Sequence, residues 1–136
     1  MLLPKRIDNM PGTDAIAKST PNGTTIGLSV VGPLVNNRHL YKKMPYDPAK
    51  DLSPIVLAVN QPSLLVVRNE LPVNGVGELI SQLKKNPGKF NYASIGNGSL
   101  SHLAMELIAH KSGTDIVHVP YAGSSQAVLA LMAGET

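Results

Sequence analysis

Apolar and polar positions alternate along the chain in short segments that glycine and proline separate. Runs rich in β-branched residues predict strands, whereas apolar residues that recur every three or four positions predict helices. From residue 64 onward strands and helices alternate, which is typical of an α/β fold with parallel strands. The predicted strands lie at residues 24–31, 55–59, 64–68, 90–94 and 116–119. The predicted helices lie at residues 13–19, 36–41, 73–85, 101–111 and 124–132.

Glycine and proline also constrain how these elements connect. Gly32 and Pro33 are expected to end the first strand. Residues 44–48 hold two prolines three positions apart and are expected to form a rigid loop. The chain ends at residues 133–136, where the alternating pattern predicts a further strand. The sequence therefore predicts an architecture that is cut at this end.

The composition fits a folded unit with an aliphatic core. The 136 residues leave room for one domain or for two incomplete lobes, and 43% of them are apolar. The core must be aliphatic because the chain contains one Phe, four Tyr and no Trp. The absence of cysteine excludes disulfides and thiolate metal sites.

The charge pattern gives no support to a nucleic-acid partner. The formal net charge is +3, and the Lys and Arg residues are scattered rather than gathered into a basic stripe. No run of about 18 apolar residues is present that would span a membrane. The apolar stretch at residues 1–3 is too short for a signal peptide, so the chain as written is expected in the cytoplasm.

Three strand-to-helix junctions combine glycine with hydroxyl side chains: residues 94–101, residues 121–125 and, less closely, residues 28–32. Free amides at a helix N-terminus and the positive end of the helix dipole attract anions, and glycine lets a ligand approach the backbone. In open α/β sheets such loops lie at the carboxyl ends of the strands, where ligands bind. The alternative is structural, because Ser and Thr before a helix are also ordinary N-caps.

Nucleotide and metal sites find little support in the sequence. The pair Gly96 and Gly98 is a poor dinucleotide motif, because Ser101 occupies the place of the third glycine. No phosphate-binding Gly-Lys-Ser or Gly-Lys-Thr sequence is present. The four histidines show no metal-ligand spacing, so neither a metal nor a cofactor is predicted.

Catalytic arrangements are no better supported. Ser99 and His102 are the candidates for a nucleophile and its base, but the chain has no Gly-x-Ser-x-Gly elbow. His102 and Glu106 lie four positions apart on one predicted helix, where an ordinary contact on the helix surface is the preferred interpretation. His118 alternates with two valines in a strand and is interpreted as a sheet residue whose hydrogen bonds are satisfied. The chain is therefore predicted not to be an enzyme.

Several collinear segments together resemble a signature of the tripartite tricarboxylate transporter receptors, also called Bug-type solute-binding proteins. The resemblance covers nearly the whole chain, and its motifs are specific. The matching segments are residues 41–48, 51–54, 86–94, 96–99, 101–104, 117–124 and 131–134.

The resemblance implies a fold and a function. Members of that family are periplasmic receptors of two α/β lobes that close over a small carboxylate, a dicarboxylate, a tricarboxylate or a carboxylated aromatic, and deliver it to a membrane permease. The chain is thus expected to hold part of a periplasmic-binding-protein type II fold, two-lobed and Venus-flytrap-like, with mixed or parallel sheets. Residues 1–68 are expected to form an incomplete first lobe and residues 69–136 an incomplete second lobe.

By the same resemblance, backbone amides and hydroxyls of the strand-to-helix loops hold the carboxylates. Ser29 is expected to be the contact of the first lobe, and the remaining contacts are expected in the second lobe. These are Ser94, Gly96, Asn97, Gly98, Ser99, Ser101, His102, Gly123 and Ser124.

The chain also departs from the family pattern. Family members are roughly twice as long, as two complete lobes require. The first strand and the glycine-rich loop after it, which normally supply much of the carboxylate grip, have no counterpart here. A truncated receptor that binds its carboxylate is therefore one interpretation. The alternative is a fragment without a ligand that forms a homodimer through exposed sheet edges.

Overall fold

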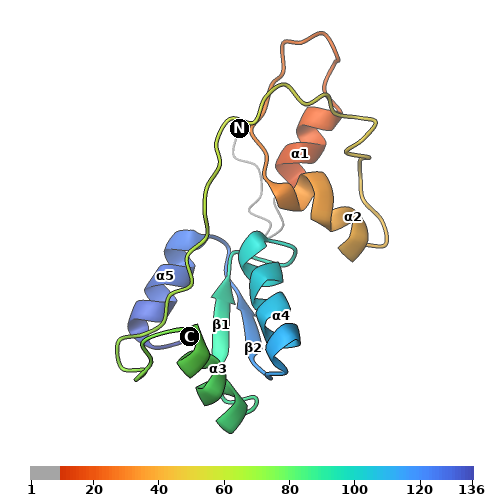
Figure 1. Ribbon diagram of the computed structural model, residues 1–136. Helices are drawn as coiled ribbons and strands as arrows, with labels where there is room; N and C mark the ends of the chain where they lie inside the picture. Colours follow the sequence, from red (N-terminus) through yellow and green to blue (C-terminus); the bar gives the residue numbers. More distant parts are fainter. Residues whose placement is uncertain (1–9) are drawn as a thin grey trace. The chain divides into compact units, whose positions relative to one another are not determined.

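The computed structural model describes residues 10–136, and its chain divides into two compact units (Figure 1). The first unit extends to Pro62, and the second runs from Ser63 to Thr136. Each unit is described by itself below. Within the described part, no helix combines the length and the apolar character that crossing a membrane requires.

The first unit is helical in its regular parts. Helix α1 spans Met10–Ala17, and a π-helical turn η1 (Gly32–Asn36) leads directly into α2 (Asn37–Leu40). Gly32 and Pro33 thus begin a helical segment instead of separating a strand from it, because proline is well tolerated in the first helical turn. Tyr46, in the predicted rigid loop, is buried and its hydroxyl donates to the Pro33 carbonyl over 2.9 Å.

Three predicted strands, at residues 24–31, 55–59 and 64–68, were wrong. These residues form no strand in the structure, and their apolar side chains are largely exposed, as with Leu28 at 79% and Leu57 at 82%. A β-branched run favours an extended backbone, but a strand also needs a neighbour that completes its hydrogen-bond ladder. Among the described residues, only β1 and β2 pair in this way.

From residue 76 onward, the second unit has the alternating architecture that the sequence predicts. Its elements are α3 (Val76–Lys85), β1 (Asn91–Ser94), α4 (Leu100–Ser112), β2 (Val117–Pro120) and α5 (Ser124–Ala133). The two strands are parallel, and they are joined through α4. Figure 1 shows α4 and α5 flanking the strands, and both helices contact β1. The predicted α/β order with parallel strands is confirmed.

The core of the second unit lies along α3 and β1. The apolar period of α3 places Leu79 and Leu83 on its inner face, and Leu83 is only 1% exposed. Tyr92 from β1 and Ala130 from α5 are also buried. Burial of these side chains is the main stabilising term for a unit with so short a sheet.

Candidate functional site

The carboxyl ends of the two strands meet at one edge of the sheet. β1 ends at Ser94 and β2 at Pro120, and these residues lie opposite each other in the register. The Tyr121 amide donates to the Ser94 carbonyl over 2.9 Å and so joins the two following loops. Residues 95–99 and 121–123 therefore leave the sheet side by side, at the edge where open α/β folds bind ligands.

The loop of residues 95–99, here called the glycine loop, is held by hydrogen bonds to serine hydroxyls. Ser94 Oγ accepts from the Gly96 amide over 3.1 Å, and Ser99 Oγ donates to the Gly96 carbonyl over 2.6 Å. Gly96 and Gly98 have φ angles of 112° and 76°, in a region that side-chain-bearing residues rarely adopt. The glycines are thus required by the shape of this loop.

Ser99 caps the helix that follows the glycine loop. Its hydroxyl accepts from the His102 amide over 3.3 Å, and its carbonyl accepts from the Leu103 amide over 3.0 Å. Ser101 Oγ accepts from the Ile95 amide over 3.2 Å. Both hydroxyls therefore have structural partners, as the capping interpretation predicts.

Replacing Ser99 tests this capping role. We expect Ser99→Ala to lower the free energy of unfolding by about 1 kcal/mol, because one amide of the first turn of α4 loses its acceptor. Ser81→Ala is the matched control, since the exposed Ser81 hydroxyl donates only to Gly77 within α3. Urea denaturation followed by circular dichroism measures both. Equal stability of the two variants would contradict the capping role.

The N-terminus of α5 is more open than that of α4. Its N-cap residue is Gly123, which has no side chain to satisfy the first amides of the helix, and a Cβ at this position would meet nothing within 4 Å. The amides of residues 124–126 occupy the first turn and have no acceptor within the helix. Ser124 is exposed. This end of α5 thus offers amide donors and a positive dipole end to an approaching anion.

A polar cluster lies between the sheet and α4, on the face of β1 that carries Tyr92 and Ser94. His118 Nε2 is 2.6 Å from Ser94 Oγ, and its ring stacks on Tyr92 with centroids 5.0 Å apart. From α4, the His102 ring lies 4.3 Å from that of His118, and Glu106 accepts from the Tyr92 hydroxyl over 2.6 Å. These five residues are called the histidine cluster below.

The histidine cluster corrects the interpretation of His102 and Glu106 on α4 and supports that of His118 on β2. His102 and Glu106 were expected to form an ordinary pair on the surface of one helix. Instead, Glu106 accepts from Tyr92 of β1. The His102 ring lies tilted against that of His118 of β2, and its Nδ1 accepts from the Gly98 amide over 3.3 Å. The satisfied hydrogen bonding expected for His118 is confirmed.

The environment of the histidine cluster shifts two pKa values. Burial lowers the pKa of His118 below its ordinary value of 6.5, the neighbouring His102 lowers it further, and Glu106 opposes both effects. Burial also raises the pKa of Tyr92, and the hydrogen bond to Glu106 acts in the same direction. His118 is therefore neutral at neutral pH, and Tyr92 keeps its proton.

The lowered pKa of His118 predicts a loss of stability in acid. The unfolded chain binds the proton more readily than the folded one, so stability is complete above the unfolded value of 6.5. Stability then falls as the pH drops from 6.5 toward the lower folded pKa, by at most about 1.4 kcal/mol per pH unit. Urea denaturation at a series of pH values measures this slope. His118→Gln should reduce it, and an unchanged slope would contradict the assignment.

The structure brings nine of the ten predicted contact residues to one edge of the second unit. They lie in the glycine loop, in the first turns of α4 and α5, and at the ends of the strands. Asn97 and Ser124 have exposed side chains, whereas Ser94 is only 1% exposed. Ser29 belongs to the first unit, where its hydroxyl lies 2.9 Å from Thr13 Oγ1. Their contact with a ligand stays a prediction.

Tyr92 and Glu106 were missed as partners of this site. A signal existed in the sequence: Tyr92 and Ser94 fall on one face of a strand, and His118 is polar between two valines in the next strand. His102 and Glu106 repeat the same polar character on one face of the connecting helix. Polar faces on consecutive elements of a βαβ unit indicate a polar interface between them.

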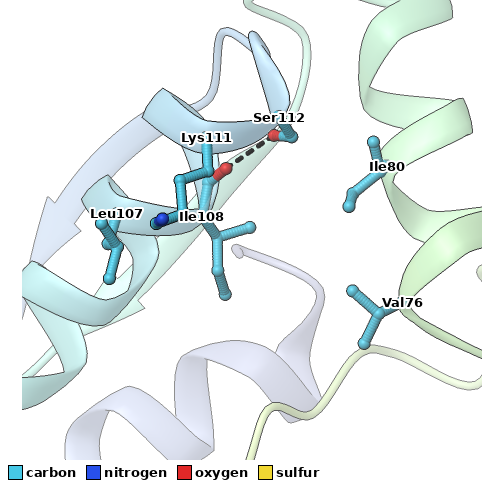
Figure 2. Close-up of a pocket in the computed structure, with 6 residues that line it drawn as sticks. All are labelled: Val76, Ile80, Leu107, Ile108, Lys111 and Ser112. Atoms are coloured by element: carbon cyan, nitrogen blue, oxygen red, sulfur yellow. Dashed lines mark hydrogen bonds between the residues drawn. The ribbon is translucent and has the colours of Figure 1, made fainter.

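A groove between α3 and α4 does not resemble an anion site. Figure 2 shows Val76 and Ile80 pointing from α3 toward Ile108 on α4. Leu107, Lys111 and Ser112 complete the lining, and the Ser112 hydroxyl is engaged with the Ile108 carbonyl over 2.6 Å. This groove is apolar and lies along the second half of α4, away from the glycine loop. The described residues include no group of three or more side chains that could hold a metal ion.

Curated relatives and solved structures resemble this chain over most of its length. It is 41% identical over 90% of its length to the UPF0065 protein in the tcbD-tcbE intergenic region of Pseudomonas sp. (strain P51), and 37% identical over 90% to Protein BugT of Bordetella pertussis. Among solved structures, it matches R. palustris Rpa4515 with adipate at a TM-score of 0.88 and 34% identity, over 93% of the chain. MatC (Rpa3494) from Rhodopseudomonas palustris with bound malate matches at a TM-score of 0.82 and 28% identity, also over 93% of the chain.

The share of each relative that the chain covers is smaller. The chain spans 36% and 38% of the two curated relatives and 42% and 43% of the two solved chains. The solved chains confirm the expected receptor fold, of which this chain represents a part. Residues 7–136 match the family TctC, described as tripartite tricarboxylate transporter family receptor. The chain belongs to the tripartite tricarboxylate transporter receptor family.

Proposed function

We propose that this chain binds a small carboxylate as part of the solute-capturing receptor of a tripartite carboxylate transporter. The observation that carries the proposal is the edge where β1 and β2 end, because two helix N-termini and two loops face it together. Neither α4 nor α5 has an acidic residue in its first turn, so no fixed negative charge there would repel an anion. The proposed contacts in the second unit are the residues predicted from the sequence except Ser94, which is only 1% exposed and supports the glycine loop instead.

The class of ligand is supported by the solved relatives. One was solved with adipate and another with malate, and both are small dicarboxylates. We further propose that the whole receptor works in the periplasm and passes its ligand to a membrane permease, as its family membership suggests. Ser29 remains a proposed contact of the first lobe.

A binding role is favoured over catalysis by the hydroxyl contacts. Ser99 Oγ donates to the Gly96 carbonyl, and the ring of His102 accepts from a backbone amide, so these two side chains are engaged elsewhere. Ser94 does form a pair with His118 at 2.6 Å, but Ser94 is only 1% exposed and offers a substrate no access. An activated nucleophile needs both a base and a reachable substrate.

Calorimetric titration tests the proposal. Adipate and malate should release or absorb heat with a saturable profile, and the neutral diamide of adipic acid should give none, because helix dipoles and amides favour the charged carboxylates. Added salt should weaken the binding of the diacids. Flat titrations with both diacids, or equal binding of the diamide, would refute the proposal.

A second candidate function is self-association, and one observation favours it. Residues 55–59 and 64–67 form no helix or strand and expose aliphatic side chains, among them Ile55 at 81% and Leu64 at 85%. Extended segments with unpaired amides and apolar side chains favour pairing with another chain. Light scattering over a concentration series tests this: a mass of twice the monomer supports it, and a monomer at the highest concentration contradicts it.

A further inference from the structure

A path of short contacts joins His118 to the glycine loop. His118 Nε2 lies 2.6 Å from Ser94 Oγ, which accepts from the Gly96 amide over 3.1 Å. The Gly96 carbonyl accepts from both the amide and the hydroxyl of Ser99, over 3.2 Å and 2.6 Å. Ser99 in turn caps α4. The path therefore runs from β2 through β1 into the loop that we propose contacts the carboxylate.

The single hydroxyl hydrogen of Ser94 couples the two ends of this path. It can point to His118 Nε2 at 2.6 Å or to the Gly96 carbonyl at 3.4 Å. The shorter distance favours donation to Nε2, which requires an imidazole without a proton on that nitrogen. When His118 is protonated, Nε2 becomes a donor, and the Ser94 hydrogen must turn to the Gly96 carbonyl. There it competes with the hydroxyl of Ser99.

The groups around His118 make its protonation an event within the site. Tyr92 of β1 stacks on its ring, and Tyr92 keeps its own proton. On α4, His102 lies 4.3 Å away between ring centroids, and the Glu106 carboxylate contributes a weaker attraction. Helix α5 contains no titratable side chain. A positive charge on His118 therefore faces one carboxylate and one imidazole, and both belong to the histidine cluster.

We propose that His118 is a positioning residue that acts through Ser94 to fix the glycine loop, and that its protonation loosens the loop and weakens carboxylate binding. The effect on carboxylate binding, the second half of this inference, rests on the proposed function. The positioning of the glycine loop by His118, the first half, does not. Acidic conditions would then favour release of the ligand. The bound carboxylate does not need to touch His118 for this effect, because His118 acts through Ser94.

Amide resonances of the loop test the first half without any ligand. In the ¹⁵N-labelled chain titrated from pH 8 to pH 5, the Gly96 resonance should move with the imidazole resonances of His118. In His118→Gln, whose side-chain amide can still accept from Ser94 but does not titrate, this movement should vanish. In Ser94→Ala, His118 should still titrate while Gly96 no longer follows it. His110→Gln, at the exposed far end of α4, is the matched control and should behave as the unmodified chain.

A Gly96 resonance that ignores the titration of His118, or that moves equally in His118→Gln, would overturn the positioning role. Carboxylate affinity tests the second half. The ratio of adipate affinity in the unmodified chain to that in His118→Gln should fall at least about threefold between pH 7.5 and the acid end of the measured titration of His118, as expected for a histidine switch. The ratio cancels the titration of adipate itself. A constant ratio overturns this half while leaving the proposed function intact, whereas absence of adipate binding in both chains refutes the proposed function and leaves the resonance test valid.

Discussion

Leu83→Ala should destabilise the second unit by about 3 kcal/mol, the largest effect on stability that we expect from a single substitution. Leu83 lies on the inner face of α3 and is only 1% exposed, so the shorter side chain leaves a cavity that the surrounding helices and strands fill only in part. A small domain is stable by about 5–15 kcal/mol in total. Thermal and urea denaturation should therefore show a large loss of folded chain at moderate temperature.

Leu107→Ala is the matched control for this substitution. Leu107 is the same residue type on a neighbouring helix, but it is 53% exposed, so its removal should cost well under half as much. Near-equal costs for the two leucines would show that α3 does not pack as described. The comparison is independent of any ligand and tests the fold alone.

The predicted strand at residues 64–68 of the second unit did not form, but sequence reasoning succeeded for residues 76–133, because the elements there satisfy one another locally. Consecutive strands at residues 91–94 and 117–120 pair with each other across a single helix, so the partners lie close in the sequence. The apolar period of α3 also predicts which of its residues are buried. Every element there receives its partner from the same short stretch of chain.

The first unit shows where such reasoning fails. The run at residues 24–31 has the composition of a strand, yet composition predicts only a preference for extended backbone. Whether a strand forms depends on pairing, and in the described part no segment pairs with this run. Gly32 and Pro33 misled for a related reason, since the same residues end one element or begin another according to their neighbours.

The sequence predicted the loops of the candidate site but not the histidine cluster that supports them. Helix-preceding Gly and Ser residues identify the edge of the sheet, because capping and anion binding use the same amides. The histidine cluster depends on the register that places Tyr92 opposite His118, and on the position of α4, whose His102 and Glu106 contact these two residues. Register is a property of tertiary packing, so single-sequence patterns indicate the polar faces but not which side chains meet.

Ser124→Asp should lower carboxylate affinity at least tenfold while leaving the chain folded and slightly more stable. Residue 124 is the first residue of α5, and its side chain is exposed. An acidic group in a first turn stabilises a helix by about 0.3–1 kcal/mol, because it complements the dipole. The same negative charge, about 4 Å from a bound carboxylate, repels it by roughly 1–4 kcal/mol. Tenfold in affinity corresponds to about 1.4 kcal/mol.

Because Ser124→Asp should lower the affinity but raise the stability, a loss of binding cannot be attributed to unfolding of the chain. Calorimetry with adipate gives the affinity, and urea denaturation gives the stability of the same preparation. Ser81→Asp adds the same charge to an exposed position on α3 and should leave the affinity within about twofold, because charges on the surface are screened beyond a Debye length of about 10 Å. If Ser124→Asp raised stability but left adipate affinity unchanged, the N-terminus of α5 would not face the carboxylate. The ligand would then depend on the glycine loop alone, where Ser99 and His102 already occupy much of the hydrogen-bonding capacity of the first turn of α4.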